Sequence, residues 1–156
     1  MGVTGIIILG ALAAGLLYAA WGDIAARTIP NWLNAAIAIG APAWWLAQGL
    51  PLWPGMAIQL GLALLVFIVF AGCFALNMMG GGDVKLLGAL ALWLPPLPLV
   101  RMLVAMALIG GVLTIAMVVL HRARRAEGQP EIPYGVAISL AALWVMANDI
   151  LTTPVA

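Results

Sequence analysis

The stretch LNMMGGGDVKLLGAL, residues 76–90, places three glycines, an aspartate and a lysine between two long apolar runs. The chain around it has 156 residues, of which 66% are hydrophobic and only 7% are charged, and its mean hydropathy is +1.19. This composition lies outside the soluble range and indicates an integral membrane protein. Because the longest polar stretch, residues 121–131, is too short to build a soluble core, we expect one transmembrane domain over residues 1–156.

Apolar runs separated by polar or Gly/Pro breaks predict an all-α, polytopic fold with about six transmembrane helices. The expected spans are 3–22, 32–50, 55–76, 84–100, 102–120 and 132–151. The fourth span is the weakest, because Pro95, Pro96 and Pro98 fall within it and proline removes a helical hydrogen bond. A helix over 83–94 alone would be about 18 Å long, against a membrane core of about 30 Å.

The basic residues predict the orientation of these spans. Six spans place Arg27, Lys85 and the arginines of RARR (122–125) on one side and only Arg101 on the other, whereas five spans leave no bias. The positive-inside rule makes the basic side cytoplasmic, so both termini are expected on the non-cytoplasmic side of a bacterial inner membrane. An aromatic belt at the outer interface is expected from four tryptophans near span ends: Trp44, Trp45, Trp53 and Trp93.

The three aspartates need a reason to be present, because an ionisable group at the centre of a span costs about 2.5–3.5 kcal/mol. Asp23 and Asp83 both lie at the cytoplasmic end of an expected span, and each is followed by a cation, Arg27 or Lys85. Two adjacent carboxylates that share one proton can supply a base and an acid, as in aspartic proteases. Asp149 lies near the outer end of the last span, where we interpret it as interfacial.

The glycines before Asp83 are expected to serve this chemistry. Gly80, Gly81 and Gly82 permit any backbone conformation, allow another chain to approach closely and leave room for a substrate backbone. A simpler interpretation is a helix break with Asp83 as the N-cap residue.

The other segment, WGDIAARTIPNW (21–32), is consistent with a polar turn between two spans. Pro30 favours an extended approach to the second span, and Asn31 is expected to cap that helix. Its simpler interpretation is an ordinary loop in which Asp23 pairs with Arg27.

Taken together, the two segments resemble the type IV prepilin peptidases, which are membrane aspartic proteases of the GxGD type. IPYGVAI (132–138) also resembles the stretch before the last span of that family. The matching motif residues are Asp23, Arg27, Ile29, Pro30 and Asn31 in the first segment, and Gly80, Gly81, Gly82, Asp83, Val84, Lys85 and Leu86 in the second.

The resemblance implies that Asp23 and Asp83 are the catalytic pair and that a basic leader is cut from a prepilin at the cytoplasmic face. The substrate would be a single transmembrane helix carrying that leader. The residues expected to shape the active site or bind substrate are Gly80, Gly81, Gly82, Lys85, Arg27, Pro30 and Asn31. Arg27 and Lys85 could equally meet anionic headgroups of the membrane lipid.

The chain departs from the longer members of the family, which carry paired cysteines in an added cytoplasmic region and often methylate the new N-terminus. Only Cys73 is present here, so the resemblance is to the compact class of Flp-type, tight-adherence pili, and no methyl transfer is expected. No metal or other cofactor is implied, because His121 has no second histidine or acidic partner near it. A net charge of +1 without a clustered basic face argues against nucleic acid.

Two functions from other classes compete with the peptidase. A small proton-coupled transporter or channel component would use the same aspartates as relay groups, but it needs polar residues along several spans. Here Gln59 and Thr114 are among the few polar residues away from the cytoplasmic side. The third interpretation is a non-catalytic subunit of a membrane assembly.

Overall fold

The computed structural model describes residues 2–123 and 132–150, without the side chains of residues 149 and 150. The expectations for Asp149, Arg124 and Arg125 therefore lie outside the described part. Every regular element in that part is helical, which confirms the all-α prediction. The elements are α1 (Val3–Ala26), α2 (Asn31–Ala47), α3 (Ala57–Ala75), α4 (Gly81–Ala91), α5 (Pro96–Ala123) and α6 (Tyr134–Val145), with short π-helical segments η1 (Leu52–Met56) and η2 (Met146–Ile150).

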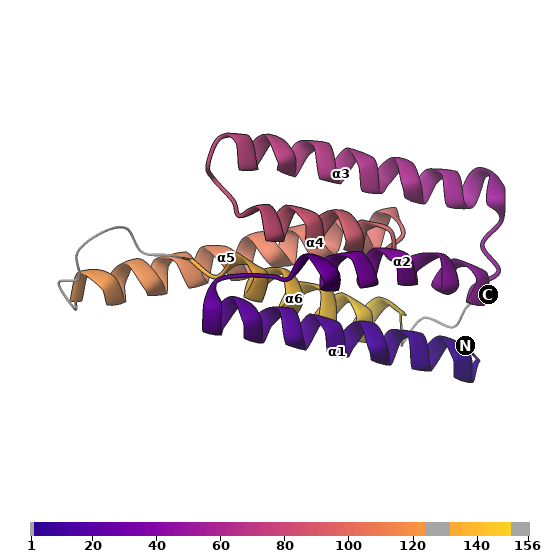
Figure 1. Cartoon of the computed structure of the whole chain (residues 1–156), viewed down its shortest axis with the longest axis horizontal. Helices are drawn as coiled ribbons and strands as arrows, with labels where there is room; N and C mark the ends of the chain where they lie inside the picture. The colour runs from indigo at the N-terminus through magenta and orange to yellow at the C-terminus, as the bar shows by residue number, and fades with distance from the viewer. Residues whose placement is uncertain (1, 124–131, 151–156) are drawn as a thin grey trace.

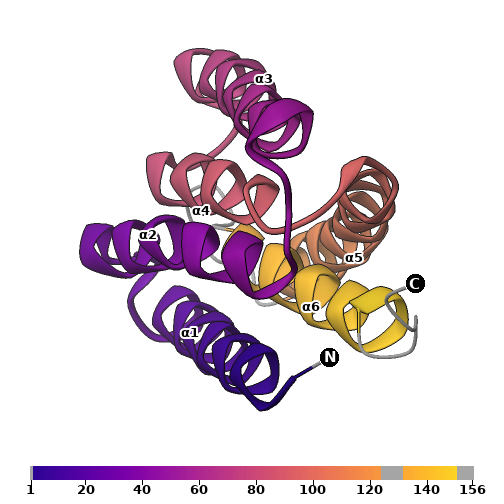
Figure 2. The same cartoon turned by 90° about the vertical axis from the view of Figure 1, so that its right-hand side faces the viewer.

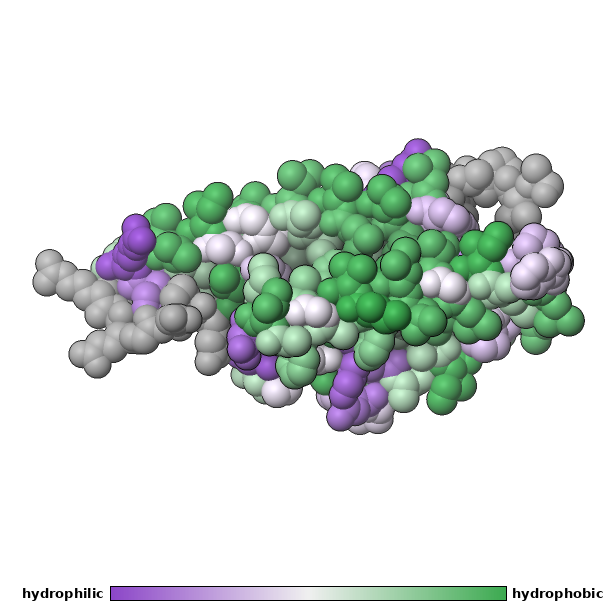
Figure 3. All heavy atoms as spheres, turned by 90° about the horizontal axis from the view of Figure 1, so that it is seen from above, coloured by the Kyte–Doolittle hydropathy of each residue, from purple (hydrophilic) through white to green (hydrophobic). Residues whose placement is uncertain are grey.

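Three of the described helical stretches are long and apolar enough to cross a membrane: Val3–Ala26, Leu52–Ala75 and Pro96–Ala123. The stretch Tyr134–Asn148 is apolar but shorter. Hydrophobic residues cover most of the face seen in Figure 3, and large apolar side chains are exposed along α3 and α5. The chain is thus a membrane protein, while the count of six spans remains a prediction.

The fourth and fifth elements begin and end elsewhere than expected. The spans 84–100 and 102–120 were predicted, but α4 ends at Ala91 and α5 runs for 28 residues from Pro96. Proline lacks an amide N–H, and the first turn of a helix needs none, so proline starts α5 instead of ending α4. Arg101 consequently lies within α5 and not between two spans.

Helix α4 occupies the centre of the bundle. It packs against α2, α3 and α6, while α1 contacts α2 and α6, and α5 contacts α6. Figures 1 and 2 show α4 between α3 and α2. From Leu86 to Ala91 every residue of α4 is buried, as expected for an apolar helix of this length that serves as core.

The tryptophans do not form the predicted belt. Trp44, Trp45 and Trp93 are buried, and only Trp53 of the four is exposed, at 80%. The indole N–H of Trp93 donates to the carbonyl of Ile37 at 2.9 Å, and that of Trp45 donates to a carbonyl of the α4–α5 connection at 2.7 Å. Buried indoles need such partners, so these side chains hold α4 against α2 and do not mark the membrane interface.

Candidate active site

The two aspartates come together at one end of the bundle. Asp23 lies in the last turn of α1 and Asp83 in the first turn of α4, and the connections after α1 and before α4 lie at the same end of the molecule, on the left in Figure 1. Asp23 is 6% exposed and Asp83 9% exposed. Both line one pocket of about 190 Å³, together with Arg27, Thr28, Ile29, Asn31, Gly80, Gly81 and Gly82.

Asp23 is held by the beginning of α6. The backbone N–H of Val136 donates to Asp23 Oδ2 at 3.2 Å, and the N–H of Gly135 also bonds to this carboxyl. The N-terminus of a helix carries unsatisfied N–H groups and a partial positive charge, both of which favour a carboxylate. A Cβ at Gly135 would lie 2.9 Å from Asp23 Oδ2, so α6 can approach Asp23 this closely only because position 135 has no side chain.

Asp83 contributes to the start of its own helix. The N-cap residue of α4 is Gly80, and Asp83 is the third helical residue, which corrects the interpretation of Asp83 as N-cap. The Gly80 N–H bonds to the Asp83 carboxyl, as the side chain at this position does in a capping box. One short stretch therefore begins the helix and fixes the carboxyl.

The electrostatic surroundings favour the neutral form of Asp83, which lies outside the three helices long enough to cross a membrane. Burial, and then the negative charge of Asp23, raise the pKa of the Asp83 carboxyl to about 6, although the hydrogen bond from Gly80 lowers it. Burial disfavours a charged carboxylate, and a second carboxylate nearby disfavours it further. The site thus contains one carboxyl that receives backbone donors from another helix and one whose pKa is raised to about 6.

The three glycines provide space and not an unusual backbone. None of them has a positive φ, and Gly81 and Gly82 are the first two residues of α4. A Cβ at Gly82 would lie 3.3 Å from Ile29 Cβ, and one at Gly81 would lie 3.3 Å from the ring of Phe74. The prediction that these glycines are needed for an unusual backbone conformation is therefore wrong. The prediction that they allow another segment to approach closely is confirmed, because Ile29 of this same chain lies beside Gly82.

The remaining predicted residues hold the connection between α1 and α2. Arg27 ends α1 in the left-handed conformation, and its N–H donates to the Asp23 carbonyl. Pro30 is the N-cap residue of α2, so Asn31 does not cap that helix. Asn31 instead accepts a hydrogen bond from Lys85 Nζ at 2.8 Å. Pro30 and Lys85 lie beside the pocket without lining it.

Sequence reasoning missed Asn34 and the role of Gly135. Asn34 is buried in α2, and its Nδ2 donates to the carbonyl of Gly82 at 3.2 Å. A signal existed, since Asn34 is a polar residue one turn after Asn31 in an otherwise apolar helix. Gly135 lies in the stretch IPYGVAI (132–138), which the family resemblance had marked, but its contact with Asp23, 112 positions away, was not predicted.

Comparison with known proteins identifies a family for this chain. The family model described as the type IV leader peptidase family matches residues 10–115, which is more than half of the chain and includes both aspartates. Neither the curated proteins nor the solved structures contain a match. With both motifs inside the matched region, the chain belongs to the type IV leader peptidase family.

Proposed function

We propose that this protein is an aspartic endopeptidase in which Asp23 and Asp83 are the catalytic residues. The observation that carries the proposal is the burial of two carboxyls, from segments 60 positions apart in the sequence, in one pocket at one end of the bundle. Family membership supports peptidase activity. An acidic group and a basic group in one site are what the hydrolysis of a peptide bond requires.

The surroundings of the two carboxyls suggest different roles. Asp23 receives backbone N–H donors from both Val136 and Gly135, whereas Asp83 receives one, from Gly80. Since such donors favour the ionised form, we assign Asp23 as the base of the pair. A water molecule loses a proton to Asp23, and its oxygen attacks the carbonyl carbon of the scissile bond. Asp83 gives its proton to the carbonyl oxygen. The tetrahedral intermediate then collapses: the C–N bond breaks, the leaving amine takes the proton held by Asp23, and a hydroxyl of the intermediate returns a proton to Asp83.

The proposed substrate is a prepilin of the Flp type, a single transmembrane helix preceded by a basic leader. Cleavage takes place at the cytoplasmic face of the bacterial inner membrane, where the positive-inside rule places Arg27 and Lys85. Gly80, Gly81, Gly82 and Asn31 shape the pocket that receives the scissile bond. No methyl transfer and no cofactor are part of the proposed reaction.

The polar residues away from the site favour a peptidase over a proton-coupled transporter. Gln59 Nε2 donates to the carbonyls of Leu92 and Leu94 at 3.1 and 3.0 Å. Thr114 donates to the carbonyl of Gly110 in its own helix at 2.7 Å. Both side chains satisfy nearby backbone, as polar groups in an apolar environment must, so neither extends a proton path from the aspartates.

The test is cleavage of a co-expressed Flp-type prepilin, measured as a mobility shift on a gel. The unaltered chain is compared with Asp23→Asn and Asp83→Asn, each at equal abundance in the membrane. We expect both variants to lose cleavage, because each substitution removes one half of the acid–base pair. Cleavage that survives in either variant would contradict the two-aspartate mechanism, and a proton-flux assay on the same variants would then test the transporter.

A further inference from the structure

A groove lies between α2, α3 and α4, with a volume of about 560 Å³. Its walls are mainly small or apolar, with Ala35 and Ala38 on α2, Ala63 on α3 and Gly88 on α4. Small residues allow a second helix to approach closely within a membrane. From Asn31 to Ala38 the groove follows α2 for about 10 Å, or two helical turns.

The groove is continuous with the candidate active site. Asn31 lines both the groove and the pocket that contains Asp23 and Asp83. Lys85, which donates to Asn31, lines the groove from α4. Asn31 therefore lies where the groove and the catalytic pocket meet.

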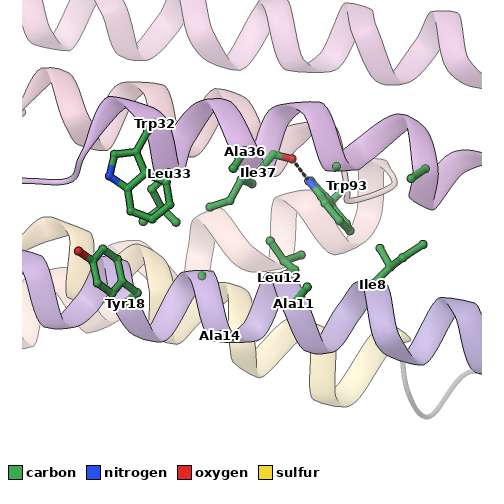
Figure 4. A pocket seen from close by; sticks show the side chains of 13 residues that line it. Ile8, Ala11, Leu12, Ala14, Tyr18, Trp32, Leu33, Ala36, Ile37 and Trp93 are labelled. Carbon is green, nitrogen blue, oxygen red and sulfur yellow. Dashed lines mark hydrogen bonds between the residues drawn. The ribbon is translucent and has the colours of Figure 1, made fainter.

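A second groove, between α1 and α2, does not have this connection. It has a volume of about 490 Å³, and none of the residues that line it also lines the catalytic pocket. Figure 4 shows Tyr18 and Trp32 facing one another in it and Trp93 entering from the α4–α5 connection. The two grooves lie on opposite sides of α2, with Ala35 in the first and Ala36 in the second.

A polar group in the first groove has an unused hydrogen-bonding capacity. Asn34 lines this groove and is 4% exposed, and its Oδ1 has no hydrogen-bond partner among the described residues. Its Nδ2 is already engaged by the carbonyl of Gly82. Since buried polar atoms are nearly always paired, an acceptor left open one turn from Asn31 points to a ligand that brings an N–H group.

We propose that the groove between α2, α3 and α4 receives the hydrophobic helix of the prepilin, and that Asn34 Oδ1 accepts a backbone N–H where that helix unwinds near the scissile bond. This inference rests on the proposed function, in which the cleaved bond lies immediately before the hydrophobic segment. The path from the catalytic pocket past Asn31 then places that segment in the groove. An unwound helix end exposes N–H groups that need acceptors.

The first test fills one groove at a time. Ala35→Trp fills the proposed groove, and Ala36→Trp is the matched control, because both alanines are exposed neighbours on α2 and each lines a different groove. We expect Ala35→Trp to lower kcat/KM for the full prepilin at least tenfold, with most of the effect in KM, and Ala36→Trp to change it less than twofold. Equal effects of the two substitutions, or a larger effect of Ala36→Trp, would overturn the proposal.

The second test does not depend on catalysis. A photoreactive benzoylphenylalanine is placed at position 35 or 36 in an Asp83→Asn background, and membranes that also contain the prepilin are irradiated. We expect a cross-link to the hydrophobic segment of the prepilin from position 35 and none from position 36. Cross-links from position 36 alone, or cross-links from position 35 to lipid alone, would overturn the proposal that this groove receives the prepilin helix.

The two proposals fail in different ways. If the unaltered chain cleaves the prepilin but position 35 gives no cross-link to it, the groove is wrong and the proposed function stands. If the unaltered chain cleaves nothing and position 35 still cross-links to the prepilin, the proposed function is wrong and the groove is a binding surface for that helix.

Discussion

Replacing Gly135 with alanine is expected to disable the site without unfolding the protein. The new Cβ would lie 2.9 Å from Asp23 Oδ2 and 2.8 Å from Ile29 Cδ1, so the Asp23 carboxyl must move away from the start of α6. That movement breaks the hydrogen bond from the Val136 N–H, which is 3.2 Å long. A hydrogen bond to a charged group contributes about 1.5–3 kcal/mol, which corresponds to a fall in kcat/KM of about 10- to 150-fold.

The fold should tolerate this substitution, because alanine has a higher helix propensity than glycine by about 1 kcal/mol. The assay compares initial rates of prepilin cleavage for the purified protein in detergent or in vesicles, and a thermal unfolding curve is recorded for each variant. Gly111→Ala is the control, since nothing lies within 4 Å of a Cβ at Gly111. If Gly135→Ala and Gly111→Ala cleave at the same rate, the start of α6 does not position Asp23 and the reasoning fails.

Three further perturbations test other parts of the structure. Because the pKa of Asp83 is raised to about 6, its carboxyl holds the proton below that pH and loses it above. The cleavage rate measured from pH 5 to pH 8 should therefore fall, with an apparent pKa near 6 that belongs to the coupled pair. A rate that rises over this range would contradict Asp83 as the acid. Gly82→Val places a side chain 3.3 Å from the α1–α2 connection, so this connection must shift; the substitution should lower the free energy of unfolding by about 1–3 kcal/mol and slow cleavage. Gly72→Val, with open space around it, should cleave normally. Trp93→Phe removes the buried hydrogen bond to the carbonyl of Ile37 and should lower the free energy of unfolding by about 0.5–1.5 kcal/mol. Trp53→Phe, at an exposed position, should leave the melting curve unchanged.

The juxtaposition of Asp23 and Asp83 was predictable from the sequence. Each aspartate lies at the end of a long apolar run, and two spans, 32–50 and 55–76, were expected between them. An even number of crossings returns the chain to the same side of the membrane, whereas an odd number would have separated the two carboxyls. An aspartate is costly in an apolar chain, and each of the two has a cation near it, so both were predicted at the same end of the molecule. In the structure both residues line one pocket. Local pattern and chain topology were enough for this result.

Tertiary contacts were harder to predict, because they join segments without a shared local pattern. The donors to Asp23 come from backbone N–H groups of Gly135 and Val136, and a backbone donor carries no sequence signal. The tryptophans gave a misleading signal, since the same amphipathic side chain suits a membrane interface and a buried site with a carbonyl nearby. Trp93 occupies a buried site of this kind, where its N–H donates to the carbonyl of Ile37.

The buried position of Trp93 bears on what holds α4, and with it Asp83, in place. The sequence predicted a short fourth helix over 83–94, with Trp93 near its far end in an aromatic belt at the membrane interface. Helix α4 is 11 residues long, or about 16 Å, and Gln59, Trp45 and Trp93 fix its far end through hydrogen bonds with backbone carbonyls. Contacts within the protein thus fix the far end of α4 relative to α2 and α3, and Asp83 lies at the opposite end of the same short helix.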